Sequence, residues 1–223
     1  MTTAAKTSFK TLLQWGDGST PDKFTTFAEI TEIEPPNQEA GEIDATSHDS
    51  TAEEAILTFL NNGTITGTCN YLYTAAQTGA EAGLGSTAVS WQLCIPNFGA
   101  RTKTVTVVEA TDVFTATTHG LTTGQPIQIS SSVTLPAGLT AGTTYYVRRI
   151  DADTFTLHTT NAGAVANSAQ QLVSDTGTGT HTLQIGNRLD VEGLFKARQF
   201  TSPLKGGLQA KFTLKVTGPV VLT

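Results

Sequence analysis

Residues 208–216, LQAKFTLKV, alternate strictly between apolar and polar side chains, and this pattern constrains the fold more than any other part of the chain. Successive side chains of a β-strand point to opposite faces of a sheet, so a period of two predicts one buried face and one solvent face. The apolar set is Leu208, Ala210, Phe212, Leu214 and Val216, and the polar set is Gln209, Lys211, Thr213 and Lys215. We therefore expect a half-buried strand with a basic outer face.

Similar strand-like segments recur earlier in the chain. Residues 12–15 and 24–33 are separated by the turn residues GDGSTPDK, which predicts a hairpin, and the second segment ends at Pro35-Pro36. Residues 64–73, which follow the turn signal Asn61-Asn62-Gly63, and residues 89–95 predict two more strands.

Two further segments carry helical signals. Residues 75–84 are alanine-rich and predict one short helix, whereas residues 53–60, EEAILTFL, fit a helical turn or a strand. With 38% hydrophobic and 14% charged residues, the chain is predicted to be mainly β, a sandwich or barrel with one short flanking helix.

The texture of the sequence changes between Arg101 and Arg188. This interval has few charges, no helical pattern, and short strand-like segments between Gly, Pro and Ser breaks: TVTVV, DVFTATT, PIQIS, TYYVRRI, DTFTLHT and HTLQI. Such spacing is typical of a small sandwich or barrel. We predict a discontinuous first domain, residues 1–102 and 187–223, with an inserted all-β domain at residues 103–186.

Membrane and redox signals are weak. The first ten residues lack the apolar run of a signal peptide, and no stretch of about 18 apolar residues is present. We expect a protein made and kept in the cytosol, or one that leaves by an unusual route. Cys69 and Cys94 belong to no CxxC pair and are expected to be buried free thiols, with an inter-subunit disulfide as the alternative.

The stretch GEIDATSHDSTAEE, residues 41–54, concentrates carboxylates around His48. An EF-hand that starts at Asp44 would need glycine at its sixth place and glutamate at its twelfth, but Asp49 and Ala55 stand there. A carboxylate pair for glycoside hydrolysis is not excluded by spacing, yet no aromatic residue that could stack on a sugar lies between Phe27 and Phe59. The stretch follows a double proline and is expected to begin as a loop.

Other catalytic or cofactor motifs are missing. His119, His158 and His181 show no metal-ligand spacing, HGLTTGQP opens no helix that could hold phosphate, and no Gly-x-Ser-x-Gly elbow is present. We therefore expect no enzyme activity, no metal and no cofactor.

Charge is distributed unevenly. Residues 1–102 carry a net −8, residues 103–186 a net −2 and residues 187–223 a net +4, within a total of −6. An acidic front and a basic tail could attract each other within the fold or between copies, although solvated faces would explain them equally. Tight nucleic-acid binding rests on Lys and Arg, so only weak passage of DNA fits this balance.

With these features in order, residues 1–102 and 187–223 resemble the major tail tube protein of long-tailed, siphophage-like bacteriophages. The segments that carry the resemblance are ITEIEPP, GEIDATSHDS, EEAILTFLNNGTITGTCNYLY and PLKGGLQAKFTLKVTGPVVLT. The insertion, with HGLTTGQPI, LPAGLTAGTTYYV, DTFTLH and DTGTGTHTL, is similar to a small β-domain that recurs in phage structural proteins. The shorter tube proteins lack this domain.

The resemblance implies a tail-tube-type β-sandwich or barrel, with six subunits in a ring and rings stacked around a tape-measure protein. It also implies tail terminator and tail tip partners, passage of DNA through the lumen, no membrane contact, assembly in the host cytoplasm and residence in the virion tail. The long loop would reach a neighbouring subunit or ring. The inserted domain would lie outside the tube, because about 80 residues would block the lumen.

Two sets of candidate residues follow. The leading hypothesis places subunit or ring contacts between the loop and basic groups of another copy, at Glu42, Asp44, Thr46, His48, Asp49, Glu53, Glu54, Lys196, Arg198, Lys205, Lys211 and Lys215. The alternative is a carbohydrate- or surface-binding, adhesin-like module that stacks ligands on Tyr145, Tyr146 or Phe155. Adjacent tyrosines on a strand point to opposite faces, so one of the two is expected in the core.

Overall fold

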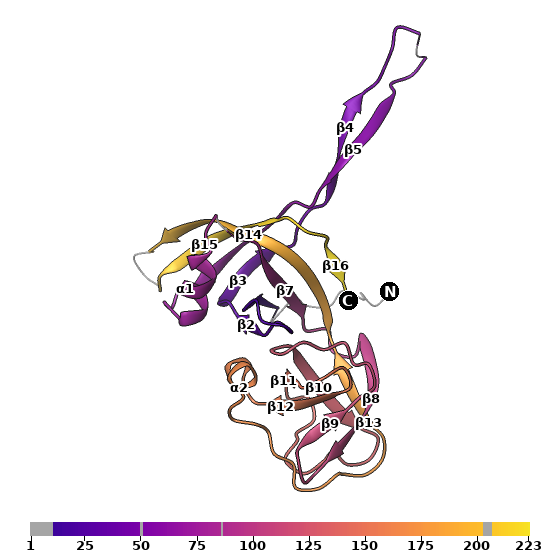
Figure 1. The fold of residues 1–223 in the computed structure, drawn as a ribbon, viewed down its shortest axis with the longest axis vertical. Coiled ribbons are helices and arrows are strands. Elements are labelled where there is room, and N and C mark those ends of the chain that lie inside the picture. Colours follow the sequence, from indigo (N-terminus) through magenta and orange to yellow (C-terminus); the bar gives the residue numbers. More distant parts are fainter. Residues whose placement is uncertain (1–10, 50, 86, 203–206) are drawn as a thin grey trace, which may run out of the picture.

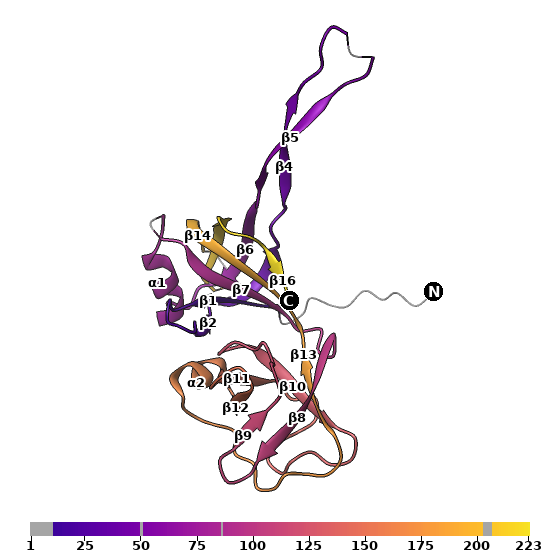
Figure 2. The same cartoon turned by 45° about the vertical axis from the view of Figure 1, so that its right-hand side comes forward.

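A computed structural model describes residues 11–49, 51–85, 87–202 and 207–223, and it confirms the mainly β class. Three parts follow one another along the longest axis: a projecting hairpin, a large curved sheet and a closed barrel (Figure 1). The hairpin and the barrel lie on opposite sides of the sheet, and the turned view shows the same order (Figure 2). Lys205, one of the predicted contact residues, lies outside the described residues.

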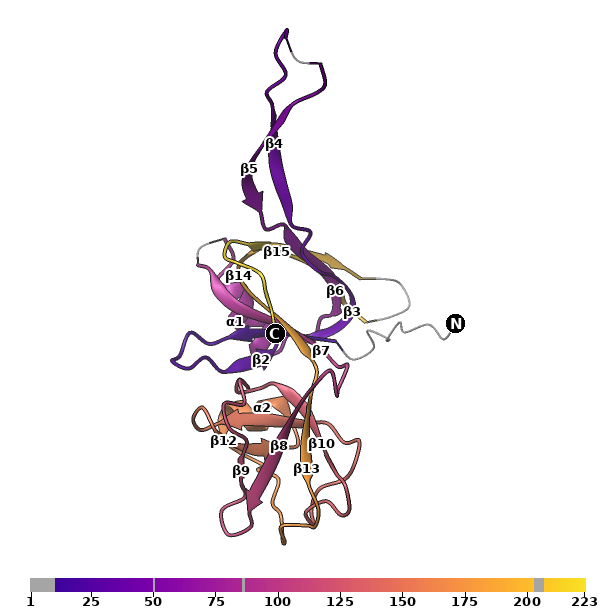
Figure 3. The same cartoon turned by 90° about the vertical axis from the view of Figure 1, so that its right-hand side faces the viewer.

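The large sheet has the strand order β2-β1-β7-β14-β15-β6-β3, with β16 paired to β14, and it curves strongly round its core (Figure 3). All of its pairings are antiparallel. Its strands are β1 (Leu12–Gly16), β2 (Phe24–Thr26), β3 (Glu29–Glu34), β6 (Thr64–Asn70), β7 (Val89–Ile95), β14 (Asn187–Thr201), β15 (Gln209–Val216) and β16 (Val221–Leu222).

The core of this sheet confirms the alternation read from residues 208–216. Ala210, Phe212, Leu214 and Val216 are buried, while Leu208 precedes β15 and is 40% exposed. Phe27 is the centre of an aromatic cluster, with ring centroids 5.8 Å from Trp91, 5.8 Å from Phe195 and 5.4 Å from Phe212.

The burial of Phe27 explains one wrong prediction. Residues 24–33 were expected to form a single strand, but the chain turns at Phe27 and Ala28, and β2 and β3 lie at the two ends of the sheet order. The Phe27 amide donates to the Leu13 carbonyl (2.9 Å) at this corner, while the Phe27 ring fills the core. The predicted hairpin of β1 and β2 is confirmed.

The predicted helix is α1 (Ala75–Ala82), and it begins with a capping box. The Thr74 side chain accepts from the Gln77 amide (3.2 Å), and the Gln77 side chain accepts from the Thr74 amide (3.2 Å), so two amides that a helix start leaves unpaired are satisfied. A second helix, α2 (Asn161–Ala166), was not predicted. Its six residues include a glycine and are too few to show a helical period; Thr160 and the left-handed Asn167 delimit it.

The interval expected to be a small sandwich or barrel contains a closed barrel with the strand order β10-β11-β12-β9-β8-β13. Each predicted segment contains one strand: β8 (Arg101–Val108), β9 (Val113–Thr115), β10 (Pro126–Ser131), β11 (Tyr145–Arg149), β12 (Thr154–His158) and β13 (His181–Ile185). The chain enters after Ile95 and leaves before Asn187, and these two residues pair in the sheet. The two connections are therefore adjacent.

Candidate subunit interface

The acidic stretch, residues 41–54, is part of a β-hairpin: it forms the end of the first strand and the connection to the second. The prediction that it begins as a loop was therefore wrong. β4 (Glu39–Asp44) pairs antiparallel with β5 (Ala55–Asn61), and the two strands belong to neither the large sheet nor the barrel. This pairing also decides the ambiguous residues 53–60 in favour of a strand. The carboxylates did not reveal it, because charged side chains are depleted in strands of globular proteins and indicate a loop.

The hairpin exposes large apolar side chains along its length. Ile43, Ile56, Leu57, Phe59 and Leu60 are between 57% and 94% exposed, and Phe59 has the largest value. Ile43 stands opposite Ile56 in the register, and Leu57 stands opposite Glu42. Because adjacent strand residues point to opposite faces, Ile56 and Leu57 place apolar groups on both sides of the ribbon. A partner on one side only would leave the other side in water.

The base of the hairpin is tied to the large sheet, which fixes its direction. Lys215 donates from Nζ to Asn61 Oδ1 (2.6 Å), and Asn62 donates from Nδ2 to the Gly218 carbonyl (2.9 Å). Gly63 has φ +73°, and a Cβ there would lie 2.2 Å from the Asn37 carbonyl oxygen. Only glycine therefore fits at this point, where the segments that enter and leave the hairpin lie close together. These contacts fix the direction in which the hairpin projects from the large sheet.

The tip of the hairpin is also locally ordered. The Asp44 carboxylate accepts from the Thr46 amide (2.9 Å). Hydrogen bonds from the Thr46 side chain and from this amide hold the pKa of Asp44 below its usual value. The Glu54 amide in turn donates to Thr46 Oγ1 (3.0 Å). The predicted contact residues of this region are all exposed along β4 and the tip: Glu42, Asp44, Thr46, His48, Asp49, Glu53 and Glu54.

The predicted basic residues divide into two groups. Arg198 forms an ion pair with Glu81 of α1, and its guanidinium lies 4.5 Å from the Phe200 ring centroid, so its charge is used within its own chain. Lys215 is engaged at the base of the hairpin. Lys196 on β14 and Lys211 on β15 are exposed. Among the described lysines that were predicted as contact residues, these two are available to contact another copy.

The residues of the surface-binding alternative do not form an exposed platform. Tyr145 is 3% exposed and Phe155 is fully buried in the barrel, where Phe155 stacks on Phe114 with centroids 5.7 Å apart. Tyr146 is half-buried and lines a groove of about 1210 Å³ between the sheet and the barrel, and burial raises the pKa of its hydroxyl. The prediction that Tyr145 or Phe155 could stack on a sugar was therefore wrong.

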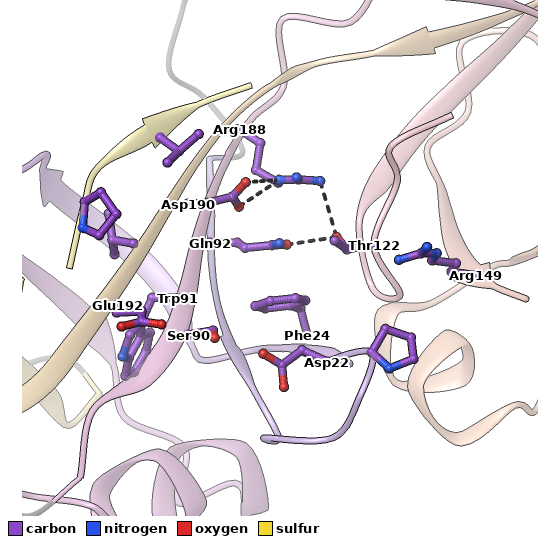
Figure 4. Close-up of a pocket in the computed structure, with 14 residues that line it drawn as sticks. Asp22, Phe24, Ser90, Trp91, Gln92, Thr122, Arg149, Arg188, Asp190 and Glu192 are labelled. Carbon is purple, nitrogen blue, oxygen red and sulfur yellow. Dashed lines mark hydrogen bonds and ion pairs between the residues drawn. The ribbon is translucent and has the colours of Figure 1, made fainter. Parts of the chain in front are cut away.

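The seam between sheet and barrel contains a second cavity of about 410 Å³, and charged side chains line it (Figure 4). Arg188 donates from Nε to Asp190 (2.8 Å) and from Nη1 to Gln125 (2.7 Å), while Thr122 donates to Gln92 Oε1 (3.0 Å). The Arg188–Gln125 and Thr122–Gln92 bonds cross the seam, whereas Arg188 and Asp190 both belong to β14. The two bonds that cross the seam attach the barrel to the sheet.

The three buried histidines and the two cysteines pack within the fold. His119 accepts from the Leu121 amide (2.9 Å), His158 contacts the Ser168 carbonyl (2.7 Å) and His181 contacts the Thr176 carbonyl (2.8 Å). Cys69 and Cys94 are free and buried, and burial raises the pKa of Cys94 to about 12. Within the described residues, no group of three or more His, Cys, Asp and Glu side chains could hold a metal ion.

The sequence did not predict that the apolar residues of β5 are exposed. One signal was present: AILTFL lacks the strict alternation of residues 208–216, as expected for a segment without one buried face.

Comparisons with known proteins complete the description. No family model and no curated protein matches this chain. A chain from the virion of a native gene transfer agent (GTA) particle is similar with a TM-score of 0.47 at 10% identity, over 98% of this chain and 99% of that one. A chain from the tail of an empty GTA particle, refined with C6 symmetry, gives 0.44 at 10% identity with the same coverage. No helix among the described residues is long and apolar enough to cross a membrane.

Proposed function

We propose that this protein is a non-catalytic structural subunit of a phage-type tail tube, in which the β4–β5 hairpin joins each copy to its neighbours. The observation that carries the proposal is the exposure of apolar side chains on both faces of a hairpin whose base is fixed to the large sheet, with Phe59 94% exposed. The sequence resemblance to tail tube proteins supports it independently.

The energetics of the hairpin favour an assembled state. An isolated two-stranded ribbon is marginally stable in water, and a side chain such as Leu or Ile contributes about 1.5–3 kcal/mol when fully buried. Ile43, Ile56, Leu57, Phe59 and Leu60 remain exposed in the single chain. Contact with other copies on both faces would bury them without any change in the rest of the fold.

The charges would select the orientation of that contact. Residues 35–63 contain six acidic side chains and no Lys or Arg, while residues 193–223 contain no acidic side chain. Glu42, Asp44, Asp49, Glu53 and Glu54 would face Lys196 and Lys211 of another copy. Exposed ion pairs contribute only about 0–1 kcal/mol each, so repetition along an assembly would make them effective.

The remaining features of the proposal follow the tail tube resemblance. Six copies would form a ring, and stacked rings would enclose a tape-measure protein and later conduct DNA during ejection. Tail terminator and tail tip proteins would close the two ends, and the subunit would assemble in the host cytoplasm and remain in the virion tail. The barrel would stand on the outside of the tube as the inserted domain.

Purified full-length protein tests this function by size-exclusion chromatography and negative-stain electron microscopy. We expect rings, and tubes of stacked rings at higher concentration. A protein that stays monomeric at every concentration up to precipitation would rule the proposal out.

A further inference from the structure

The groove of about 1210 Å³ between the sheet and the barrel runs along one edge of the large sheet. Every residue from Ala28 to Ile33 lines it, although successive residues of a strand point to opposite faces. A cavity that touches all of them lies along the edge of the strand, where backbone N–H and C=O groups point outward. β3 ends the strand order and pairs with β6, so this edge has no partner strand among the described residues.

The floor of the groove is apolar. Leu93 of β7 is buried in the core of the large sheet, and Ile30 and Ile33 of β3 pack against the same core while remaining partly exposed. Pro126 and Tyr146 line the groove on the barrel side. An open strand edge is a template for pairing, and natural proteins usually cover it. The groove therefore fits one more extended strand with an apolar side chain directed inward.

The chain's own N-terminal segment leads into this groove. Thr11 and Leu12 line the groove, so residues 1–10 are attached at its wall. Pairing is antiparallel at every step of the order β1-β7-β14-β15-β6-β3, so β1 and β3 run in opposite directions in the curved sheet (Figure 3). A strand that continued β1 toward the N-terminus would lie antiparallel along the free edge of β3. The six residues of β3 span about 20 Å, which ten extended residues exceed.

Charge selects this segment over a strand from a second copy. Glu29, Glu32 and Glu34 are exposed and lie along the free edge, on the face where β6 presents polar residues. Residues 1–10 contain two lysines and no acidic side chain. The β3 edge of another copy has the same glutamates, and the β4–β5 hairpin contains six acidic side chains and no Lys or Arg. Both would place like charges next to each other, which destabilises strand pairing.

The alternation of β1 assigns a face to each side chain of the segment. Leu13 and Trp15 pack in the core of the large sheet, so in a continued strand Phe9 lies on the core side, and Lys6 and Lys10 lie on the outer side. The Phe9 ring would then meet the apolar floor, and the lysines would lie beside the glutamates of β3. Apolar burial and charge pairing thus favour the same strand orientation.

We propose that residues 6–10 add as an antiparallel strand to the free edge of β3 in their own chain, with the Phe9 ring in the groove. This strand closes the curved sheet and covers an edge that would otherwise be open to other chains. The inference concerns a single copy and goes beyond the proposed function, because it holds whether or not the protein forms a tube.

A cysteine pair in the full chain, Ser8→Cys/Glu32→Cys, tests the position of the segment with a short bismaleimide. The native Cys69 and Cys94 are buried, so the reagent reaches the two introduced thiols of the folded protein. A bridged chain gains the mass of one reagent, independent modification of both thiols adds two, and a bridge between copies gives a covalent dimer.

Phe9→Asp in the same cysteine background is the matched control, because it keeps the reach of the segment and removes its apolar anchor. Thermal unfolding establishes that each variant folds, and Phe9→Ser replaces Phe9→Asp if that variant does not. We expect bridging within one chain in dilute protein, and bridging about tenfold or more slower with Phe9→Asp, since a buried aromatic side chain is lost.

Hydrogen exchange of the chain without introduced cysteines gives a second readout. The amides of residues 29–34 should exchange about tenfold or more faster in Phe9→Asp than in wild type, whereas those of β12 in the barrel should not change. Bridging that Phe9→Asp leaves unchanged, covalent dimers as the main product, or exchange of residues 29–34 that is equal in the two proteins overturns the proposal.

Discussion

Asn161, the first residue of α2, donates from Nδ2 to the carbonyl oxygen of Phe24 in β2 at 2.9 Å, across 137 positions of sequence. Its second acceptor is the Gly124 carbonyl (3.0 Å), and its own Oδ1 accepts from the Thr26 amide (2.9 Å). One side chain of the barrel thus satisfies backbone groups of both parts of the seam. A buried backbone group left without a partner costs about 1–3 kcal/mol.

Asn161→Ala should therefore lower the free energy of unfolding by about 1–3 kcal/mol and loosen the barrel from the sheet. Denaturant unfolding measures the stability, and limited proteolysis between Ile95 and Arg101 measures the loosening. Thr159→Ala changes an exposed residue close to Asn161 in the sequence; it is the matched control and should change neither. Equal effects of the two variants would contradict the role of Asn161.

Gly124→Ala tests the same seam through sterics. Gly124 has φ +97°, and a Cβ there would lie 1.9 Å from the Phe24 carbonyl oxygen. Gly142 has φ +73° with nothing within 4 Å of the added atom, so Gly142→Ala reports the backbone strain alone. We expect about 1–2 kcal/mol of destabilisation for Gly142→Ala and clearly more for Gly124→Ala. Similar values in thermal unfolding would show that the seam can open at this point without cost.

Stability should fall in mild acid because of buried histidines. Burial lowers the pKa of both His119 and His158, so the folded state binds fewer protons than the unfolded state below about pH 6.5. The free energy of unfolding should be constant above that pH and should decrease as the pH falls below it. Each histidine contributes at most about 1.4 kcal/mol per pH unit.

Urea unfolding at a series of pH values from 7.5 to about 5.5 measures this slope. His158→Asn should reduce the slope, because it removes one buried histidine whose pKa is lowered. A slope that His158→Asn leaves unchanged would contradict this role of His158.

Charge reversal on the hairpin should weaken assembly without weakening the fold. Glu42→Lys is the suitable variant, because Glu42 is exposed and Asp44 holds the Thr46 amide at the tip. Glu109→Lys makes the same charge change on an exposed residue of the barrel. We expect Glu42→Lys to shift assembly to higher protein concentration, with an effect that decreases as salt screens the charges. Light scattering over a salt series follows it; identical curves for the two variants would exclude a role for Glu42.

The sequence alone determined the strands with a regular environment. Residues 208–216 and the six short barrel segments were predicted correctly because one face of each strand lies in a core and the pattern records that burial. It also placed α1, whose capping box is local. The acidic segment was identified as a candidate contact, because carboxylates without any catalytic or metal spacing are visible in the sequence.

Only the tertiary structure decided what depends on distant residues. Leu57 and Phe59 are exposed because β4 and β5 pair only with each other and pack on no other described part of the chain. The local sequence does not show whether a strand packs on a core. Phe27 divides one apparent strand because three rings from β7, β14 and β15 enclose it. Arg198, a predicted contact residue, forms an ion pair with Glu81, which lies 117 positions away in the sequence. Local pattern records the period of burial, whereas partners far apart in sequence meet only when the chain has folded.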